Sequence, residues 1–293
     1  MTLHVPVLLQ ETIDLLDLSP GFVFVDGTLG GGGHSMEVSK RFGDSVRIIG
    51  IDQDPDALKR STEALRALGA NFITHVGNFR DIDKILNELE VGKVNAILLD
   101  IGLSSDQLAG ERGFSFQKDA PLDMRMSKDG VTAADILNSW DEAALELTLR
   151  GFGEEKYSRR IAREIVARRE VKPFQSTNDL LEAVHAAVPA SYKHGRTNPA
   201  TKTFQALRIA VNEELTALEV GLTKGFESLL PEGRMAVITF HSLEDRIVKN
   251  FFKTKVTEEE GTLISKKPLT ATEEEVDRNP RSRSAKLRVI KKT

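Results

Sequence analysis

A strand-like run that breaks into glycines constrains the fold of this chain more than any other stretch. Residues 22–25 have the apolar composition of a buried strand, Asp26 follows, and glycine fills five of the next seven positions. Glycines after a strand let backbone N–H groups approach a ligand without interference from a Cβ atom. A tight turn that binds nothing is the alternative interpretation. The dinucleotide fingerprint G-x-G-x-x-G is not met, because the sixth position counted from Gly30 is Ser35.

Strand-like and helix-like segments alternate over the first hundred residues. The further strands are expected at 46–51, 72–76 and 94–99, and the helices at 35–42, 55–68 and 82–89. This alternation predicts an α/β fold with a parallel sheet and right-handed crossovers. Ligands bind such sheets at the carboxyl ends of the strands. Three strands run into an aspartate, so we expect the carboxylates of Asp26, Asp52 and Asp100 along one edge.

The alternation stops after the fourth strand. Residues 108–201 carry several helix-capping signals and no convincing buried strand. We therefore predict an inserted all-helical subdomain over 108–201. Residues 1–107 and 202–293 are predicted to form the other, discontinuous domain around a Rossmann-like sheet.

The chain beyond the insertion returns to sheet-forming material. An apolar stripe from Phe204 to Leu222 predicts one long helix that packs against the sheet. A strand is expected at 235–240, and an edge hairpin at 263–266 and 287–290.

Two groupings of polar residues are poor candidates for catalysis or metal binding. His241, Ser242 and Asp245 have the side chains of a catalytic triad, but a triad draws its members from separate elements. Ser242 and Asp245 instead predict an acidic variant of the helix capping box. His34 has no His or Cys neighbour at metal-ligand spacing, so no metal site is expected.

Composition limits the compartment and the partners. The 293-residue chain has no cysteine and a net charge of −4. It therefore has no disulfide, thiolate metal site or thiol nucleophile, as is typical of a reducing cytosol. No run approaches the roughly 18 apolar residues of a membrane helix, so we expect a cytoplasmic protein without a membrane partner. The acidic balance disfavours a uniformly basic nucleic-acid binder but allows local basic surfaces.

Two segments are locally basic. Residues 154–172 hold seven lysines and arginines, of which four are expected on one helical face: 156, 159, 160 and 163. A solvated, salt-bridged face is one interpretation, because glutamates alternate with these cations. A surface that follows RNA phosphates is the other. Residues 278–292 add seven more basic side chains.

The glycine loop also fits part of a second pattern, acidic-x-G-x-G-x-G, over Asp26–Gly32 with Thr28 in place of the first glycine. This pattern is similar to the first motif of S-adenosylmethionine-dependent methyltransferases. Such a ligand requires loop amides, a carboxylate for its ribose hydroxyls and an apolar wall for its adenine. Asp52 and Phe79 are placed for the last two roles. Their alternatives are an ordinary helix N-terminal residue and a core aromatic.

Collinear motifs across nearly the whole chain resemble the bacterial ribosomal RNA small-subunit methyltransferase H family, also called MraW. The matching stretches are HVPVL from residue 4, DGTLGGGGHS from 26, IDQDP from 51, DIGLSSDQL from 100, RGFSF and PLDMRM within 112–126, GEEKYSRRIAREIV from 153, NPATKTFQALRIAVNEEL from 198, FHSLEDRIVK from 240 and NPRSRSAKLRVIKK near the end. One departure is Asn198, where the family more often has His.

The resemblance implies methylation of the exocyclic N4 amine of a cytidine in 16S, or small-subunit, ribosomal RNA. S-adenosylmethionine would be the cofactor, and the inserted helical subdomain would recognise the RNA or the assembled small subunit. The implied cofactor contacts are Gly32, Gly33, His34, Asp52, Phe79, Asp100 and Gln107.

The acceptor chemistry is less defined by the motifs. DNA methyltransferases that act on amines carry a Pro-Pro motif after the fourth strand, whereas residues 100–105 here lack proline. We therefore hypothesise that Asp100 or a nearby backbone carbonyl accepts a hydrogen bond from the target amine. Methylation of another nucleic acid or of a protein, and an RNA-binding assembly factor with little chemistry, are the alternatives.

Overall fold

The computed structural model describes residues 6–103, 110–127, 129–195 and 198–293, which divide into two compact units. Unit 1 comprises residues 1–102 and 215–293, and unit 2 comprises residues 103–214. No helix among the described residues has the length and apolar character that crossing a bilayer requires.

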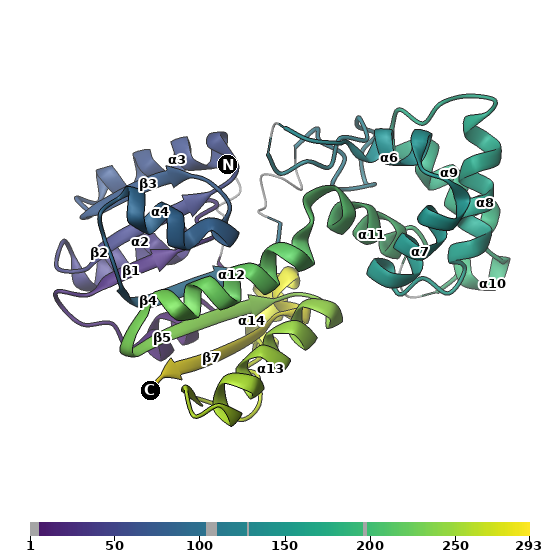
Figure 1. Ribbon diagram of the computed structural model, residues 1–293. Helices are drawn as coiled ribbons and strands as arrows, with labels where there is room; N and C mark the ends of the chain where they lie inside the picture. The colour runs from purple at the N-terminus through teal and green to yellow at the C-terminus, as the bar shows by residue number, and fades with distance from the viewer. Residues whose placement is uncertain (1–5, 104–109, 128, 196–197) are drawn as a thin grey trace. The chain divides into compact units, whose positions relative to one another are not determined.

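A seven-stranded sheet with the order β3-β2-β1-β4-β5-β7-β6 forms the centre of unit 1 (Figure 1). The strands are β1 Val23–Asp26, β2 Arg47–Asp52, β3 Phe72–Val76, β4 Val94–Asp100, β5 Leu229–Thr239, β6 Gly261–Leu263 and β7 Lys286–Lys292. The first five pair in parallel, and β7 runs antiparallel between β5 and β6. The prediction of an α/β fold with a parallel sheet is confirmed, and so is the late antiparallel strand pair.

Helices cover both faces of this sheet, and the strands therefore alternate between two apolar cores. Phe24 and Leu98 face one core with residues of α1 Leu9–Leu16, α2 Gly33–Phe42 and α3 Pro55–Ala67. Their neighbours Val25 and Leu99 face a second core with residues of α4 Ile82–Glu88, α12 Glu214–Ser228 and α13 Ser242–Thr257. Because both faces are covered, the strands consist of consecutive apolar residues.

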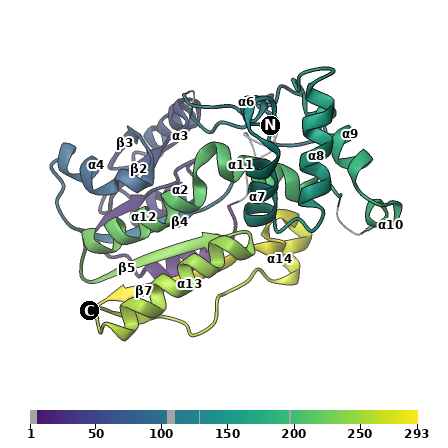
Figure 2. The same cartoon turned by 45° about the vertical axis from the view of Figure 1, so that its right-hand side comes forward.

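Unit 2 is helical, and one buried cluster forms its core. The helices among its described residues are α6 Ala133–Ser139, α7 Glu142–Gly153, α8 Ser158–Arg169, α9 Thr177–Ala187, α10 Ala190–Lys193 and α11 Thr201–Asn212. The helix α7 packs against both α8 and α11, and α9 packs against α8 (Figure 2). At Gly153 a Cβ atom would lie 2.5 Å from the carbonyl oxygen of Lys202, so glycine permits the close approach of α7 and α11.

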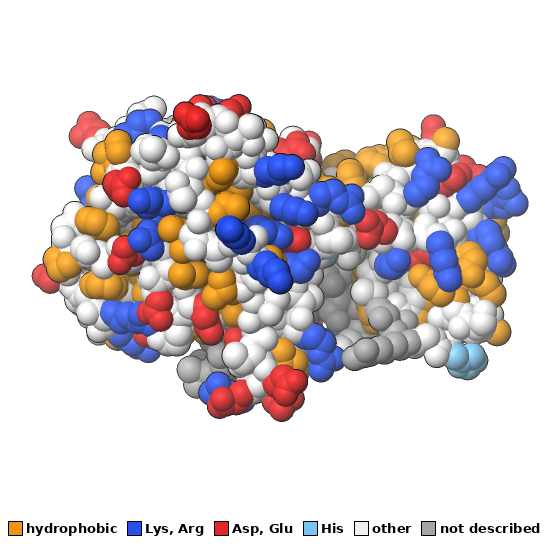
Figure 3. Space-filling model, turned by 90° about the horizontal axis from the view of Figure 1, so that it is seen from below, with side chains coloured by type: hydrophobic (Ala, Val, Ile, Leu, Met, Phe, Trp, Pro, Cys, Tyr) orange, Lys and Arg blue, Asp and Glu red, His pale blue; other side chains and the backbone are white. Residues whose placement is uncertain are grey.

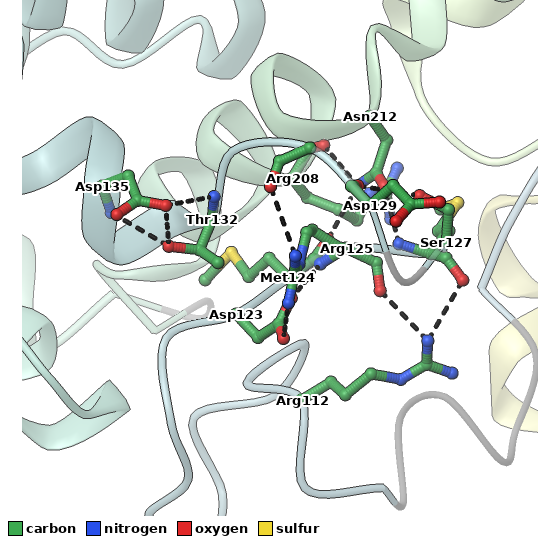
Figure 4. A network of polar contacts seen from close by, with 12 residues as sticks. Arg112, Asp123, Met124, Arg125, Ser127, Asp129, Thr132, Asp135, Arg208 and Asn212 are labelled. Carbon is green, nitrogen blue, oxygen red and sulfur yellow. Dashed lines mark hydrogen bonds and ion pairs between the residues drawn. The ribbon is translucent and has the colours of Figure 1, made fainter.

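An irregular segment before α6 is held in place by side chains rather than by backbone ladders (Figure 4). The Asn212 side chain accepts from the N–H of Met126 at 2.8 Å and donates to the carbonyl of Met124 at 2.8 Å. The Arg125 guanidinium donates to both carboxylate oxygens of Asp123, at 2.7 and 2.9 Å. Arg112 donates to the carbonyls of Arg125 and Met126 at 3.2 and 3.1 Å. Arginines of the RGFSF and PLDMRM motifs thus have structural partners within unit 2.

The single long helix predicted from Phe204 to Leu222 is wrong. The chain forms two helices, α11 and α12, separated at Glu213, whose φ of 50° lies in the left-handed region and ends α11. The apolar stripe continues across the break, but Phe204 lies in the core of unit 2 and Leu222 in that of unit 1. Helical periodicity shows that a face is buried without showing which core buries it.

The boundaries between the units also differ from those predicted from the sequence. They lie at 102/103 and 214/215, whereas the sequence placed them at 107/108 and 201/202. The second boundary differs because α11 packs on α7 and belongs to the helical unit.

Candidate active site

The ends of β2, β1 and β4 lie side by side in the sheet, and each strand ends in an aspartate. Asp26 is level with Gly50 on one neighbour and with Leu98 on the other. Asp52 and Asp100 therefore extend two residues beyond this level on either side. The three carboxylates occupy the edge at which open parallel sheets bind ligands.

The glycine loop crosses this edge through backbone hydrogen bonds to the strands on both sides. The N–H of Gly27 donates to Leu98 and the N–H of Leu29 donates to Ile51, both at 2.9 Å. Gly32 has a φ of +77°, which favours glycine, and a Cβ there would lie 3.0 Å from Ser61. At Gly31 a Cβ would meet nothing within 4 Å. The loop therefore leaves open space at Gly31 beside a turn that favours glycine at position 32.

Asp52 shapes the loop from the β2 side. Its carboxylate accepts from the N–H of Gly30 at 2.7 Å and from the N–H of Asp54 at 2.8 Å. The N-cap of α3 is Asp54, which accepts from the N–H of Asp56 at 3.0 Å, so Asp52 does not cap this helix. Burial raises the pKa of Asp52 despite the backbone hydrogen bonds that its carboxylate accepts.

Asp26 is the most deeply enclosed of the three carboxylates, with 2% of its surface exposed. Ser35 donates to it at 2.7 Å and the N–H of Thr28 donates at 3.3 Å. Burial raises the pKa of Asp26 to about 6. Thr28 also links Asp26 to Asp100, because the Thr28 hydroxyl accepts from the N–H of Asp100 at 2.6 Å.

Asp100 carries the least satisfied carboxylate at this edge. Its Oδ1 atom is buried and has no hydrogen-bond partner among the described residues. Its Oδ2 atom lies 3.9 Å from Nδ1 of His34. Burial, followed by the negative charge of Asp26, raises the pKa of Asp100 to about 7, while the positive charge of Arg281 opposes the rise.

The N-terminal segment places His34 beside Asp100. The His34 ring lies in the first turn of α2, with its Nε2 atom 3.2 Å from the carbonyl oxygen of Val7. Pro6 packs where a Cβ of Gly33 would be, at a distance of 2.2 Å. The HVPVL and GGGGHS motifs are therefore in direct contact, and together they fix the imidazole.

Phe79 begins a short 3-10 helix just after β3 and is half-buried. It packs against the second core of unit 1, and a Cβ at Gly221 of α12 would lie 2.4 Å from its ring. A Cβ at Gly27 would lie 3.2 Å from the Phe79 Cβ atom. Phe79 thus contacts both the core and the glycine loop, so the core-aromatic interpretation is correct for part of its surface. Gln107, the remaining predicted contact, lies outside the described residues.

The capping box predicted for Ser242 and Asp245 is displaced by one residue. The N-cap of α13 is His241, which accepts from the N–H of Glu244, while Glu244 accepts from the N–H groups of Phe240 and His241. Asp245 instead pairs with Arg288 and Lys286 of β7 at 2.7 and 3.0 Å. The spacing was right, but an imidazole can also accept at an N-cap.

Three residues near the edge were missed as individual contributors. Thr28 and Ser35 support the carboxylates, and Arg281 lies close enough to Asp100 to affect its pKa. In the sequence, Thr28 is a departure from the glycine pattern, and Arg281 is one basic residue of the tail. Neither carries a local signal that it would reach a strand end far away in sequence.

The edge fits a ligand that combines a positive charge, hydroxyl donors and a close approach to the backbone. Ionising two buried carboxylates next to each other is unfavourable, and a bound cation or hydrogen-bond donor relieves that cost. The unpartnered Oδ1 of Asp100 and the open space at Gly31 provide such places. S-adenosylmethionine, with its sulfonium, amino and ribose groups, meets these requirements.

Comparisons with known proteins agree with this chemistry. The model of the MraW methylase family matches residues 1–293. Proteins named ribosomal RNA small subunit methyltransferase H from Heliobacterium mobile and Carboxydothermus hydrogenoformans are 46% and 47% identical. Both alignments cover 99% of this chain, and 98% and 97% of the relatives. A crystal structure of a candidate rRNA methylase from Clostridium thermocellum covers 99% of this chain and 100% of its own, with a TM-score of 0.50 and 13% identity, which supports the fold alone.

Proposed function

The chain belongs to the MraW methylase family, and from this premise we propose that it methylates the exocyclic N4 amine of a cytidine in small-subunit ribosomal RNA. S-adenosylmethionine is the methyl donor of the family. The proposed RNA substrate is supported by the 46–47% identity, over almost the entire chain, to relatives named ribosomal RNA small subunit methyltransferase H. The cytidine amine comes from the resemblance of the motifs.

The proposed cofactor contacts come from the strand edge. Gly32 and Gly33 begin α2, whose N-terminal amides suit the carboxylate of the amino-acid moiety. Asp52 suits the ribose hydroxyls, because its carboxylate lies at the end of β2 and carboxylate oxygens accept hydrogen bonds from hydroxyl groups. Phe79 borders the adenine position, and His34 and Asp100 border the reacting centre. When bound, S-adenosylmethionine supplies a methyl group activated by a sulfonium.

Asp100 is the proposed acceptor for the target amine. The lone pair of a cytosine N4 amine is delocalised into the ring, so the site must orient the amine and accept hydrogen bonds from its protons. The buried, unpartnered Oδ1 of Asp100 suits that role. The carboxylate must be ionised for its oxygens to accept hydrogen bonds from the amine protons. Because the pKa of Asp100 is raised to about 7, the ionised fraction depends on pH near neutrality.

Unit 2 is the proposed RNA-recognition element. Within residues 154–172, the later cations have structural partners: Arg168 pairs with Glu164 at 2.8 Å, Lys172 pairs with Asp179 at 2.9 Å, and Arg169 donates to backbone carbonyls. The earlier ones, which include Lys156 and Arg160, are exposed at the start of α8.

The start of α8 also differs from the predicted helical face. Lys156 precedes the helix and lies over the rings of Tyr157 and Tyr192, at 5.0 and 4.7 Å. Arg159 and Arg160 have no carboxylate partner within the described residues. The salt-bridged interpretation is confirmed for the later half of the basic run, and RNA contact is proposed for residues 156–160 only.

The test is methyl transfer from labelled S-adenosylmethionine to isolated small-subunit RNA, to immature particles and to assembled small subunits. Label in RNA, mapped by nuclease digestion and mass spectrometry to N4-methylcytidine, is the expected result. Label in a protein or in another nucleoside would show that the methyl acceptor is not the proposed cytidine. An absence of label, with cofactor and RNA both bound, would favour the assembly factor. Unchanged single-turnover transfer by Asp100→Ala at saturating cofactor would remove Asp100 from the mechanism.

A further inference from the structure

The exposed face of α13 carries a row of cations on unit 1 itself. Arg246, Lys249 and Lys253, here called the α13 stripe, are all exposed and follow the spacing of one helix face. The opposite face buries Val248 and Phe252 in the core. Figure 3 views the molecule from the side of α13 and shows Lys and Arg side chains gathered in one area of unit 1. The helix thus has one apolar and one basic face.

Ion pairing does not account for the two lysines of the stripe. Within the described residues, neither Lys249 nor Lys253 has a carboxylate partner, and α13 has no acidic residue after Asp245. Asp245 is itself matched by Arg288 and Lys286 of β7. Lys249 and Lys253 therefore add positive charge that no carboxylate matches within the described residues, in a chain whose net charge is −4. A locally unbalanced positive surface on an acidic protein is the electrostatic feature of a polyanion site.

The stripe begins near the edge where the carboxylates lie. Ile238 of β5 is level with Asp100 of β4, and α13 starts three residues after β5 ends. Arg246 lies one helical turn into α13, and the stripe runs on for about 10 Å. A single strand whose base reaches Asp100 would have its backbone within reach of this helix.

We infer that the α13 stripe is a second RNA-binding surface, on the catalytic unit, which contacts backbone phosphates next to the target nucleotide. The inference rests on the proposed RNA substrate but concerns where the RNA is held. Exposed Lys and Arg on one helix face contribute salt-dependent affinity without reading bases. The stripe is therefore expected to strengthen binding of RNA regardless of the sequence around the cytidine.

The test compares two triple variants with equal charge changes. The stripe variant is Arg246→Gln, Lys249→Gln, Lys253→Gln, and the control is Lys40→Gln, Lys59→Gln, Arg66→Gln, whose residues are exposed on α2 and α3. The stripe variant is expected to bind isolated small-subunit RNA about tenfold or more weakly, with a slope of log affinity against log salt reduced by about 2. Its affinity for S-adenosylmethionine and its maximal transfer rate are expected to match those of the control. Lys249→Glu with Lys253→Glu is expected to weaken binding further.

Equal RNA affinity and salt slope in the two triple variants would overturn the inference, even if the unmodified protein methylates RNA well. Conversely, loss of RNA affinity in the stripe variant alone would support it even if no label reached RNA, which would count against the proposed function only. Retained RNA binding with lost affinity for an acidic ribosomal protein would also overturn it, because the surface would then serve a protein. Equal thermal unfolding of the two variants checks that both are folded.

Discussion

The carboxylates at the strand edge of unit 1 and those just before and within the first turn of α6 in unit 2 have pKa values shifted in opposite directions. In unit 2, hydrogen bonds from Arg125 lower the pKa of Asp123, and hydrogen bonds from Thr132 lower that of Asp135. In unit 1, burial raises the pKa of Asp26 to about 6 and that of Asp100 to about 7. The first pair stabilises the fold, whereas the second costs stability whenever it is ionised. Unmatched buried charge is a common feature of functional sites, which is the reason that Asp100 is the proposed acceptor.

The largest expected effect is on the rate of methyl transfer. Replacing Asp100 by Asn keeps the shape but removes an oxygen able to accept hydrogen bonds from the amine. We expect single-turnover methyl transfer to fall by about 10²–10³-fold, with S-adenosylmethionine affinity changed much less. Rapid-quench assays at saturating cofactor and RNA measure the first quantity, and calorimetry measures the second. In the unmodified protein, the rate is expected to rise with pH through about 7.

The same substitution is expected to stabilise the fold above neutral pH. A carboxyl group whose pKa is raised on folding binds its proton more tightly in the folded state, so its contribution to stability is lost as pH rises from about 4 to about 7. Asn resembles the protonated form at every pH. Asp100→Asn should therefore match the unmodified protein near pH 4 and exceed its free energy of unfolding by about 4 kcal/mol at pH 8. Urea unfolding at both pH values is the measurement, and a variant less stable at pH 8 would contradict it.

A smaller effect tests whether the open space at Gly31 is occupied by the cofactor. Gly31→Ala adds a methyl group to a place where nothing lies within 4 Å. We expect about a tenfold loss of S-adenosylmethionine affinity with little change in thermal unfolding. The matched control is Gly151→Ala in α7, where a Cβ also meets nothing and should stabilise the helix by about 0.5–1 kcal/mol. Unchanged cofactor affinity in Gly31→Ala would mean that this space is not part of the site.

The smallest effect belongs to the balanced charges of unit 2. Arg125→Met removes the two hydrogen bonds to Asp123 and one to the carbonyl of Gly130. The expected loss is about 1 kcal/mol of stability, with cofactor affinity and Asp100 chemistry unaffected. Chemical denaturation measures it against Arg150→Met, whose side chain is 64% exposed. Weaker cofactor binding in Arg125→Met would break the contrast between the two regions.

Much of unit 1 was predictable because its signals are local. Strand composition, the glycine loop and the aspartate at the end of each strand depend on neighbouring residues, and parallel topology follows from their alternation. The placement of Gly32, Asp52 and Asp100 on one edge could be predicted for this reason. The role of Arg281 could not, because it depends on the late η2 segment Pro280–Ser284 lying near β4 in space.

In unit 2, the helix break and the partners of charged side chains could not be predicted from neighbouring residues. The break at Glu213 occurs within a perfect apolar stripe, and only the presence of two cores explains it. The roles of individual cations are equally hard to predict from the sequence. Arg125 and Arg168 pair with carboxylates, whereas Lys249 is exposed, and only the structure shows this difference.

The pairing of β4 with β5 has a consequence for how the chain folds. Asp100 and Ile238 are level in adjacent strands although all of unit 2 separates them in sequence. Closing so long a loop is entropically unfavourable in a disordered chain, and prior folding of the inserted helices shortens the effective loop. We expect the insertion to gain protection first in pulsed hydrogen exchange, with the central strand pair following. The unit that is proposed to hold the RNA would then also act as the scaffold on which the catalytic edge assembles.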